Sequence, residues 1–203
     1  IQHLSKEGDS VIVPTPNFNG QLQMLAGLKR KIIEIPADTQ GFDLERLEQV
    51  MQSSGAKACL LTANYQNPLG FCLSNAEKEK IAQLAARYQC YVIEDDIYGE
   101  LYFGKKRPRT CKYYDTKGLV MHCSSLSKSL APGYRIGWVL PGQFLDEVRF
   151  MKRMNDISSP TLTQAAMAHF LQHGRYEYHL KKLRNALHTQ CLRYMQGIIE
   201  HLP

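Results

Sequence analysis

The sequence predicts an α/β fold in which a mostly parallel sheet is covered by crossover helices. Two observations point to this class. Short apolar runs alternate with longer segments whose apolar residues recur at helical spacing, which is the order that repeated strand and helix units produce. Most of the short runs are apolar at successive positions, as strands of a parallel sheet buried on both faces must be.

Six runs of four or five residues are the expected strands. Val and Ile recur in most of them, and β-branched residues favour strands. In chain order the runs are Ser10–Val13, Lys31–Ile35, Ala58–Thr62, Cys90–Glu94, Leu119–Cys123 and Ile136–Leu140.

Helical patterns lie between and after these runs. The first is expected to open at Phe42, because the leucines, Val and Met that follow share one helix face. A capping box, Ser74-Asn75-Ala76-Glu77, predicts the start of the second. Further helices are expected from Phe144, Leu162 and Tyr176, so the chain turns mainly helical toward its end.

Composition places the chain among soluble globular proteins. A length of 203 residues suits one domain or a piece of a larger protein. The apolar fraction is 44% and the charged fraction 22%, which are ordinary values. No apolar run approaches the ~20 residues that span a bilayer, so we expect no membrane association.

The net charge of +6 is a weak indication of nucleic-acid binding, because the Lys and Arg residues are scattered along the chain. The densest basic run is Lys105–Arg109. It could serve as a polyanion-binding patch or a targeting signal, but its position after a strand favours a solvated loop.

Six cysteines occur without a Cys-x-x-Cys pair, and Cys59 and Cys123 lie inside apolar runs. This distribution is typical of buried thiols in a reducing compartment, and it argues against a disulfide framework or a zinc site. We therefore expect a cytoplasmic protein and assign no metal.

Both ends of the sequence fall in helical patterns. Ile1–Leu4 reads as the end of a helix that began upstream, and Ile198–Pro203 stops in or just after another. No repeat, low-complexity tract or flexible linker lies between them. We therefore expect residues 1–203 to form the central part of one domain in a longer protein.

The residues that follow the expected strands carry most of the chemistry. Ligands of sheets of this kind bind beyond the carboxyl ends of the strands. An aromatic ring, an amide, a carboxylate, a phenol, hydroxyls, a lysine and an arginine are expected there. These residues are Phe18, Asn67, Asp95, Tyr98, Ser125, Ser127, Lys128 and Arg135.

A planar, anionic and electron-poor cofactor would require this set. It needs a ring to stack on, a carboxylate beside a ring nitrogen, donors for a ring oxygen, a lysine for an aldehyde and cations for a phosphate. Pyridoxal 5'-phosphate meets each requirement.

The order of motifs resembles the fold-type I aminotransferases of class I/II. Asn67-Pro68-x-Gly70 is followed by Asp95-x-x-Tyr98, then by Ser125-x-Ser127-Lys128, with Arg135 seven residues further on. The likeness covers most of the chain. It implies the large domain of an aspartate aminotransferase-like fold, with a mostly parallel seven-stranded sheet.

The resemblance also implies catalytic roles. Lys128 would bond to the cofactor aldehyde and, once freed, would carry the proton between substrate and cofactor. Asp95 would face the pyridinium nitrogen and keep it protonated. Tyr98 would donate to the ring oxygen.

Further residues would bind the cofactor. The resemblance implies that Phe18 stacks on the ring and that Asn67 donates to its oxygen. Ser125, Ser127 and Arg135 would approach the phosphate, where the arginine makes the strongest, charge-assisted contact.

Each assignment has a simpler alternative. Asn67–Gly70 is also a common turn, and Phe18 could be a core residue. Asp95-Asp96 could begin a helix or a loop, or bind a divalent cation. Ser125-Leu126-Ser127-Lys128 also fits the Ser-x-x-Lys pattern of penicillin-recognising enzymes. The chain has neither the Ser-Asp-Asn nor the Lys-Thr-Gly element of those enzymes.

Two kinds of protein share such a site. The detailed sequences of residues 65–71, 93–103 and 130–138 resemble the effector domain of MocR-type regulators in the GntR superfamily, in which that domain follows a DNA-binding winged helix. The alternative is a stand-alone aminotransferase similar to the aminoadipate aminotransferases, which share the Gln-Asn-Pro and Glu-Asp-Asp patterns.

Parts of the family's domain plan are expected outside this sequence. They are an upstream phosphate-binding loop, a C-terminal small domain and any winged-helix domain. The resemblance implies a homodimer for the intact protein, an amino acid or other amine as effector or substrate, and contact with DNA only through the separate N-terminal domain.

Overall fold

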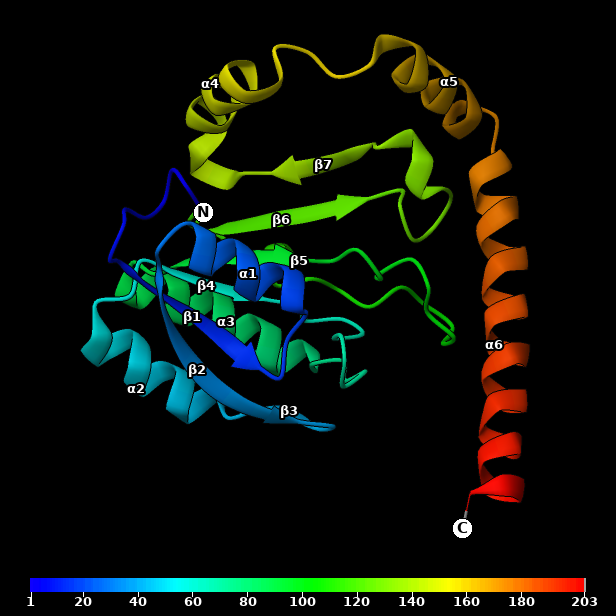
Figure 1. Cartoon of the computed structure of the whole chain (residues 1–203), viewed down its shortest axis with the longest axis horizontal. Coiled ribbons are helices and arrows are strands. Elements are labelled where there is room, and N and C mark those ends of the chain that lie inside the picture. Colours follow the sequence, from blue (N-terminus) through cyan, green and yellow to red (C-terminus); the bar gives the residue numbers. More distant parts are fainter. Residues whose placement is uncertain (203) are drawn as a thin grey trace. The chain divides into compact units, whose positions relative to one another are not determined.

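The computed structural model describes residues 1–202 and contains a seven-stranded sheet (Figure 1). Its strand order is β3-β2-β1-β4-β5-β6-β7. The strands are β1 Ser10–Thr15, β2 Lys31–Asp38, β3 Gly41–Phe42, β4 Ala58–Leu61, β5 Tyr91–Asp95, β6 Val120–Ser125 and β7 Gly137–Leu140. The pairs β2–β1, β1–β4, β4–β5 and β5–β6 are parallel, whereas β3 pairs antiparallel to β2. The predicted fold class and all six predicted strands are confirmed.

Six α-helices accompany the strands within the described residues. They are α1 Asn19–Gly27, α2 Leu44–Ser54, α3 Asn75–Tyr88, α4 Leu145–Asp156, α5 Thr161–Gln172 and α6 Arg175–His201. Three short 3₁₀ helices are η1 Cys111–Tyr114, η2 Pro132–Tyr134 and η3 Gly142–Phe144. None of the helices in residues 1–202 combines the length and apolar character needed to cross a membrane.

The chain divides into two compact units. The first comprises residues 1–96, 109–124 and 138–158, and it contains almost all of the sheet with α1 to α4. The second comprises residues 97–108, 125–137 and the chain from 159 onward, including α5 and α6. No linker pattern in the sequence marks this division, because each unit is assembled from several separate segments.

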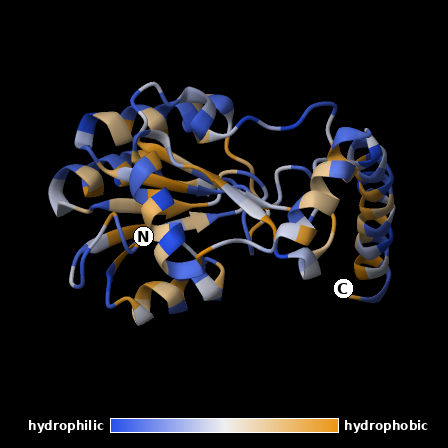
Figure 2. Cartoon of the chain, turned by 90° about the horizontal axis from the view of Figure 1, so that it is seen from above, coloured by the Kyte–Doolittle hydropathy of each residue, from blue (hydrophilic) through white to orange (hydrophobic). Residues whose placement is uncertain are grey.

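The core of the first unit lies on both faces of the sheet. Along β1, Ile12 packs with residues of α2 and α3, whereas Val11 and Val13 pack with Leu25 of α1. Successive side chains of a strand point to opposite faces, so an uninterrupted apolar strand serves two helix layers. Figure 2 shows the apolar colouring along the central strands.

Helix ends in this unit follow from local chemistry. Asp43 caps α2 by accepting the backbone N–H groups of Glu45 and Arg46, so the helix begins at Leu44 and not at Phe42, which lies in β3. The predicted capping box of α3 is confirmed, because the Ser74 and Glu77 side chains each accept the other's backbone N–H.

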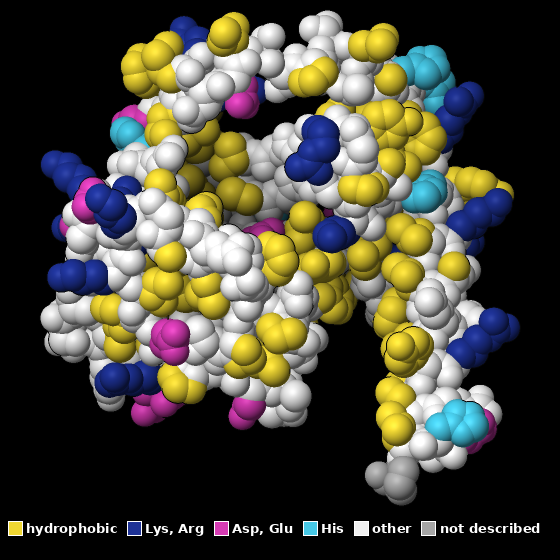
Figure 3. All heavy atoms as spheres, in the orientation of Figure 1, with side chains coloured by type: hydrophobic (Ala, Val, Ile, Leu, Met, Phe, Trp, Pro, Cys, Tyr) yellow, Lys and Arg dark blue, Asp and Glu magenta, His cyan; other side chains and the backbone are white. Residues whose placement is uncertain are grey.

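Other details differ from the sequence pattern. Helix α1 and the two-residue strand β3 were not predicted, since neither has a strong periodicity. Residues 2–4 form a turn in which the Ser5 N–H donates to the Ile1 carbonyl, four residues back as in an α-helix, and a helix that begins upstream stays a prediction. The basic run Lys105–Arg109 is a loop, as predicted. On the face shown in Figure 3, Lys and Arg side chains are spread singly over the surface.

A buried polar network in the first unit joins the residues that follow β4 and β5 to the middle of β6. Asn64, just after β4, donates its Nδ2 to Asp96 Oδ1 at 2.8 Å. The other carboxylate oxygen, Oδ2, lies 3.2 Å from His122 Nε2 of β6. Lys78 of α3 donates its Nζ to Asn64 Oδ1 at 2.7 Å. All four residues are buried, and the Asn64 amide links the Lys78 side chain to the Asp96 carboxylate.

A second buried carboxylate lies beside this network. Glu94 of β5 accepts the N–H of Cys111 at 2.7 Å and of Lys112 at 3.0 Å, and it thereby holds the first turn of η1. Burial raises the pKa of Glu94 from its usual range, although these two N–H donors act in the opposite direction. Both buried carboxylates, Asp96 and Glu94, therefore interact with polar groups of the same chain.

Replacing Lys78 with methionine should lower the free energy of unfolding by about 1–3 kcal/mol, the cost of leaving a buried polar partner without its charged donor. Urea unfolding of the full-length protein measures this change. The matched control is Lys80→Met on the same helix, where the Lys80 Nζ pairs with Glu48 at 2.7 Å but the side chain is 40% exposed. That control should change stability by less than about 1 kcal/mol. Equal effects of the two substitutions would contradict the importance of the network.

Candidate functional site

The first turn of α1 presents an exposed aromatic ring. Phe18 is the N-cap of the helix, and its side chain is 53% exposed. Its N–H donates to Asn17 Oδ1 at 2.6 Å. A Cβ added to Gly20 would lie 2.6 Å from Phe18 Cε1, so the ring occupies space that only glycine leaves free. Phe18 is thus held on the surface of this unit and is not a core residue.

Asp95 is the last residue of β5 and pairs with Cys123 of β6. Its carboxylate Oδ2 accepts a hydrogen bond from Gln21 Nε2 at 3.0 Å. Asp95 is half-buried, whereas Gln21 is 8% exposed. The carboxylate therefore sits at a strand end, where an amide donor from α1 holds it.

Asp96 has a different role from its neighbour. It is 1% exposed, and its carboxylate contacts Asn64 and His122 in the buried network. The Ser124 hydroxyl donates to its carbonyl at 3.1 Å. The two adjacent carboxylates thus bond to different groups, which argues against their acting together as ligands of one cation.

The turn that contains Asn67 is closed by its neighbour Gln66. The Gln66 N–H donates to Phe71 O at 3.0 Å, and the Gln66 Oε1 accepts the Leu69 N–H at 2.9 Å. Gln66 Nε2 also donates to Pro16 O at 2.8 Å. Gln66 is buried, whereas Asn67 is half-buried. This turn after β4 is therefore tied to the segment that follows β1.

Lys128 lies in the second unit, on a segment that folds back on itself. The Leu126 N–H donates to Ile136 O at 3.0 Å, and the N–H groups of Leu130 and Ala131 both donate to Leu126 O. Lys128 itself is exposed. A closed loop therefore presents the lysine side chain to its surroundings.

Helix α6 anchors the lysine segment. The Ser129 hydroxyl lies 2.7 Å from the Tyr176 hydroxyl, and His179 Nε2 lies 3.0 Å from Ser129 O. Ser129 is 1% exposed. Burial raises the pKa of Tyr176, although the Ser129 hydrogen bond opposes this effect. The residue next to Lys128 is thus fixed on the long helix.

Three of the remaining predicted residues of the second unit, Ser125, Ser127 and Arg135, lie on the same segment as Lys128, and the fourth, Tyr98, lies on segment 97–108. The Ser127 N–H donates to Ser125 Oγ at 3.2 Å. Arg135 is exposed and donates its Nη1 to Pro132 O at 3.1 Å. Tyr98 is half-buried, and its carbonyl accepts the Leu101 N–H at 2.9 Å.

Segment 97–108, which contains Tyr98, also contacts α6. Arg184 Nη1 donates to Glu100 O at 3.2 Å, and its guanidinium lies 4.4 Å from the centre of the Tyr102 ring. The two segments that carry predicted site residues in this unit are therefore supported by the same helix.

The structure thus gives the local setting of each predicted residue. Phe18, Asn67 and Asp95 belong to the first unit, and the other five belong to the second. Their convergence on one ligand stays a prediction. Sequence reasoning missed Gln21 and Gln66, which support predicted residues. The sequence marks them only as glutamines in the segments that follow two expected strands, eight residues after Val13 and four after Thr62.

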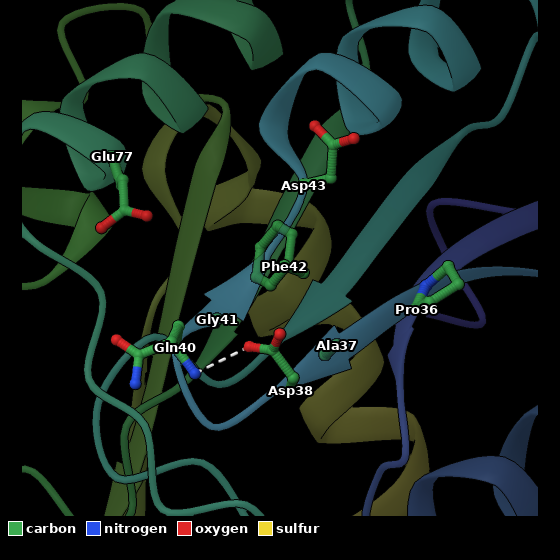
Figure 4. A pocket seen from close by; sticks show the side chains of 8 residues that line it. All are labelled: Pro36, Ala37, Asp38, Gln40, Gly41, Phe42, Asp43 and Glu77. Carbon is green, nitrogen blue, oxygen red and sulfur yellow. Dashed lines mark hydrogen bonds between the residues drawn. The ribbon is translucent and has the colours of Figure 1, made fainter.

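A pocket of about 470 Å³ lies elsewhere in the first unit, beside β2, β3 and the start of α2 (Figure 4). Its carboxylates serve local structure. Asp38 accepts the Gln40 N–H at 2.7 Å, Asp43 caps α2, and Glu77 belongs to the α3 capping box. It therefore gives no indication of a second functional site.

Comparison with known proteins agrees with this setting. The model of the family described as aminotransferase class I and II matches residues 1–196. The chain is 40% identical over 204 aligned positions to YdcR, an uncharacterised HTH-type transcriptional regulator of Escherichia coli, and the match covers 100% of this chain and 44% of YdcR. An uncharacterised aminotransferase of Saccharolobus solfataricus is 32% identical, with 97% of this chain and 50% of that protein covered.

A solved structure shows the same fold. The kynurenine aminotransferase of Pyrococcus horikoshii superposes with a TM-score of 0.92 at 27% identity, covering 100% of this chain and 52% of that one. The chain thus spans about half the length of the proteins it matches. Since the family model covers nearly every residue, the chain belongs to the aminotransferase class I and II family.

Proposed function

We propose that the chain is the effector-sensing, pyridoxal phosphate-binding domain of a MocR-type transcriptional regulator of the GntR superfamily. The observation that carries the proposal is similarity over the full chain to two Escherichia coli HTH-type regulators, YdcR and YjiR, each at 40% identity. The aminotransferase of Saccharolobus solfataricus is 32% identical. The matches cover only 44% and 43% of the two regulators, which leaves room for a separate DNA-binding domain in the intact protein.

The local geometry suits the cofactor. The exposed ring of Phe18 over Gly20 offers a flat surface for stacking. Asp95 ends a strand with its carboxylate oriented by an amide, and a carboxylate at such a position favours a protonated ring nitrogen. Lys128 is exposed on an anchored loop. When bound there, pyridoxal phosphate would supply an electron sink for bonds at an amine-bearing carbon.

Each predicted residue has a role in this proposal. The Lys128 amine would bond to the cofactor aldehyde and could carry a proton once released. Asn67 and Tyr98 would donate to the ring oxygen. Hydroxyl groups and one guanidinium would bind the phosphate, and these belong to Ser125, Ser127 and Arg135.

The regulator would respond to an amino acid or another amine that competes for the cofactor aldehyde. Such a ligand shifts an equilibrium between conformations only if it binds one of them more tightly. In a homodimer, the two DNA-binding domains would then change their spacing or freedom. DNA affinity would thereby follow the concentration of the amine.

A stand-alone aminotransferase is the second candidate. The Saccharolobus solfataricus relative and the Pyrococcus horikoshii structure favour it, because both are named as aminotransferases and each matches nearly the whole chain. The two candidates share the cofactor site and differ in the rest of the protein. A helix-turn-helix domain upstream of Ile1 in the full gene product would select the regulator.

Borohydride reduction of the full-length protein loaded with pyridoxal phosphate should attach the cofactor to Lys128, because reduction makes the bond between amine and aldehyde permanent. Peptide mass spectrometry locates the label. The Lys128→Ala variant should carry no label. Labelling of a different lysine in the wild-type protein would refute the assignment.

The substitution Asp95→Asn should weaken pyridoxal phosphate binding about 10- to 100-fold, which corresponds to losing one charge-assisted hydrogen bond of about 1.5–3 kcal/mol. Titration by cofactor absorbance measures the affinity. Asp38→Asn, a substitution of the same type in the β2–β3 turn, should leave it unchanged. Equal affinities of the wild-type and Asp95→Asn proteins would remove Asp95 from the site.

If the regulator proposal is correct, full-length protein should bind its own promoter fragment with an affinity that changes about 5- to 150-fold when cofactor and an amine effector are added, the usual range of allosteric coupling. Gel-shift titration with and without pyridoxal phosphate and a panel of amino acids measures this change. The Lys128→Ala variant should lose the response. Binding that ignores both DNA sequence and ligand would favour the stand-alone enzyme.

A further inference from the structure

We propose that Gln21 is a positioning residue for Asp95, whose carboxylate it holds at the end of β5 in the ionised form that faces the cofactor ring nitrogen. This inference rests on the proposed function, because it concerns the use of Asp95 in binding pyridoxal phosphate. Gln21 itself contacts the carboxylate and not the reacting atoms.

The contact joins two distant parts of the sequence within the first unit. Gln21 Nε2 of α1 donates to Asp95 Oδ2 at 3.0 Å, which is a normal hydrogen-bond length. An ionised carboxylate only accepts hydrogen bonds, so the amide must turn its NH₂ group toward it. The orientation of the Gln21 amide is therefore defined by Asp95.

The other end of the same amide indicates why a polar side chain is present there. Gln21 is 8% exposed, and within residues 1–202 its Oε1 is buried without a hydrogen-bond partner. A buried acceptor without a partner is unfavourable, and such groups are rare in folded proteins. An apolar side chain would avoid this cost. The hydrogen bond from its Nε2 to Asp95 is therefore the interaction that explains why a polar side chain occupies this buried position.

The first turn of helix α1 contains both Gln21 and its N-cap Phe18. The Gln21 N–H donates to Phe18 O at 2.9 Å, so the two residues are joined by the first turn of the helix. One turn later, Leu25 is fully buried in the core between α1 and the sheet. Packing at Leu25 thus fixes the height of the first turn relative to β5. The same turn then carries both the stacking surface and the support of the carboxylate.

The chemistry of the pair favours a charged Asp95. Hydrogen bonding to the charged form of a carboxylate stabilises that form. An amide donor does so without adding a positive charge, in contrast to an Arg or Lys donor at the same place. The bond to Gln21 therefore restricts the rotation of the carboxylate without weakening its attraction for a protonated ring nitrogen.

Three variants of the full-length protein test the inference. Gln21→Leu removes the donor, and Gln21→Glu replaces it with a second negative charge. Gln23→Leu is the matched control, since Gln23 lies on the same helix and is exposed. The readout is the dissociation constant of pyridoxal phosphate, measured for each variant over a range of pH.

We expect Gln21→Leu to bind the cofactor about 10-fold more weakly, the effect of losing one hydrogen bond to a charged group, and Gln21→Glu to bind more weakly still. For Gln21→Glu, the ratio of its dissociation constant to that of the wild type should fall as the pH is lowered. Once protonated, the carboxyl group introduced at position 21 can donate to Asp95 as the amide does. Gln23→Leu should match the wild type at every pH.

The Gln21→Glu ratio separates positioning from a general loss of structure. A misfolded variant would not regain affinity on acidification, so a ratio that does not depend on pH would overturn the inference. Wild-type affinity in Gln21→Leu, with normal labelling of Lys128, would overturn it and leave the proposed function intact. Failure of the wild-type protein to bind cofactor would instead overturn the proposed function, and this inference with it.

Discussion

The candidate site in the first unit depends on the contacts that the buried Asp96 carboxylate makes with Asn64 and His122. It links Asn64, in the chain after β4, to His122 of β6, and Lys78 joins this network by donating to Asn64. Asp96 follows the last residue of β5, and its carboxylate contacts Asn64 and His122, whereas the Asp95 carboxylate contacts Gln21. Different elements therefore hold the two neighbouring carboxylates. One carboxylate of the adjacent pair serves structure, and the other is directed away from that network.

In the second unit, Lys128 lies on a turn outside the regular helices and strands, and other contacts must hold that turn in place. Backbone hydrogen bonds close the loop around Leu126, and α6 holds it through Ser129. The same helix supports residues 97–108 through Arg184. A long helix with contacts to both segments limits how far either can move independently of the other.

Much of the architecture could be predicted from sequence. Strands buried on both faces leave long apolar runs, and capping chemistry marks the start of α3. Helix α1 could not be predicted, because it buries only Gln21 and Leu25 and therefore lacks an apolar stripe. The paired roles of Gln21 and Asp95, 74 positions apart, depend on tertiary packing that no local pattern encodes. Motif order identified the candidate residues of the site, but the residues that hold them were found only in the folded chain.

The amide at position 21 has a consequence for the kind of signal this domain could read. Glutamine has no proton to lose or gain near neutral pH, so the support of Asp95 adds no acid–base equilibrium of its own. A histidine in the same place would link the electron-withdrawing power of the cofactor to the acidity of its surroundings. With glutamine, the hydrogen bond that supports Asp95 is the same at every pH at which the carboxylate stays ionised.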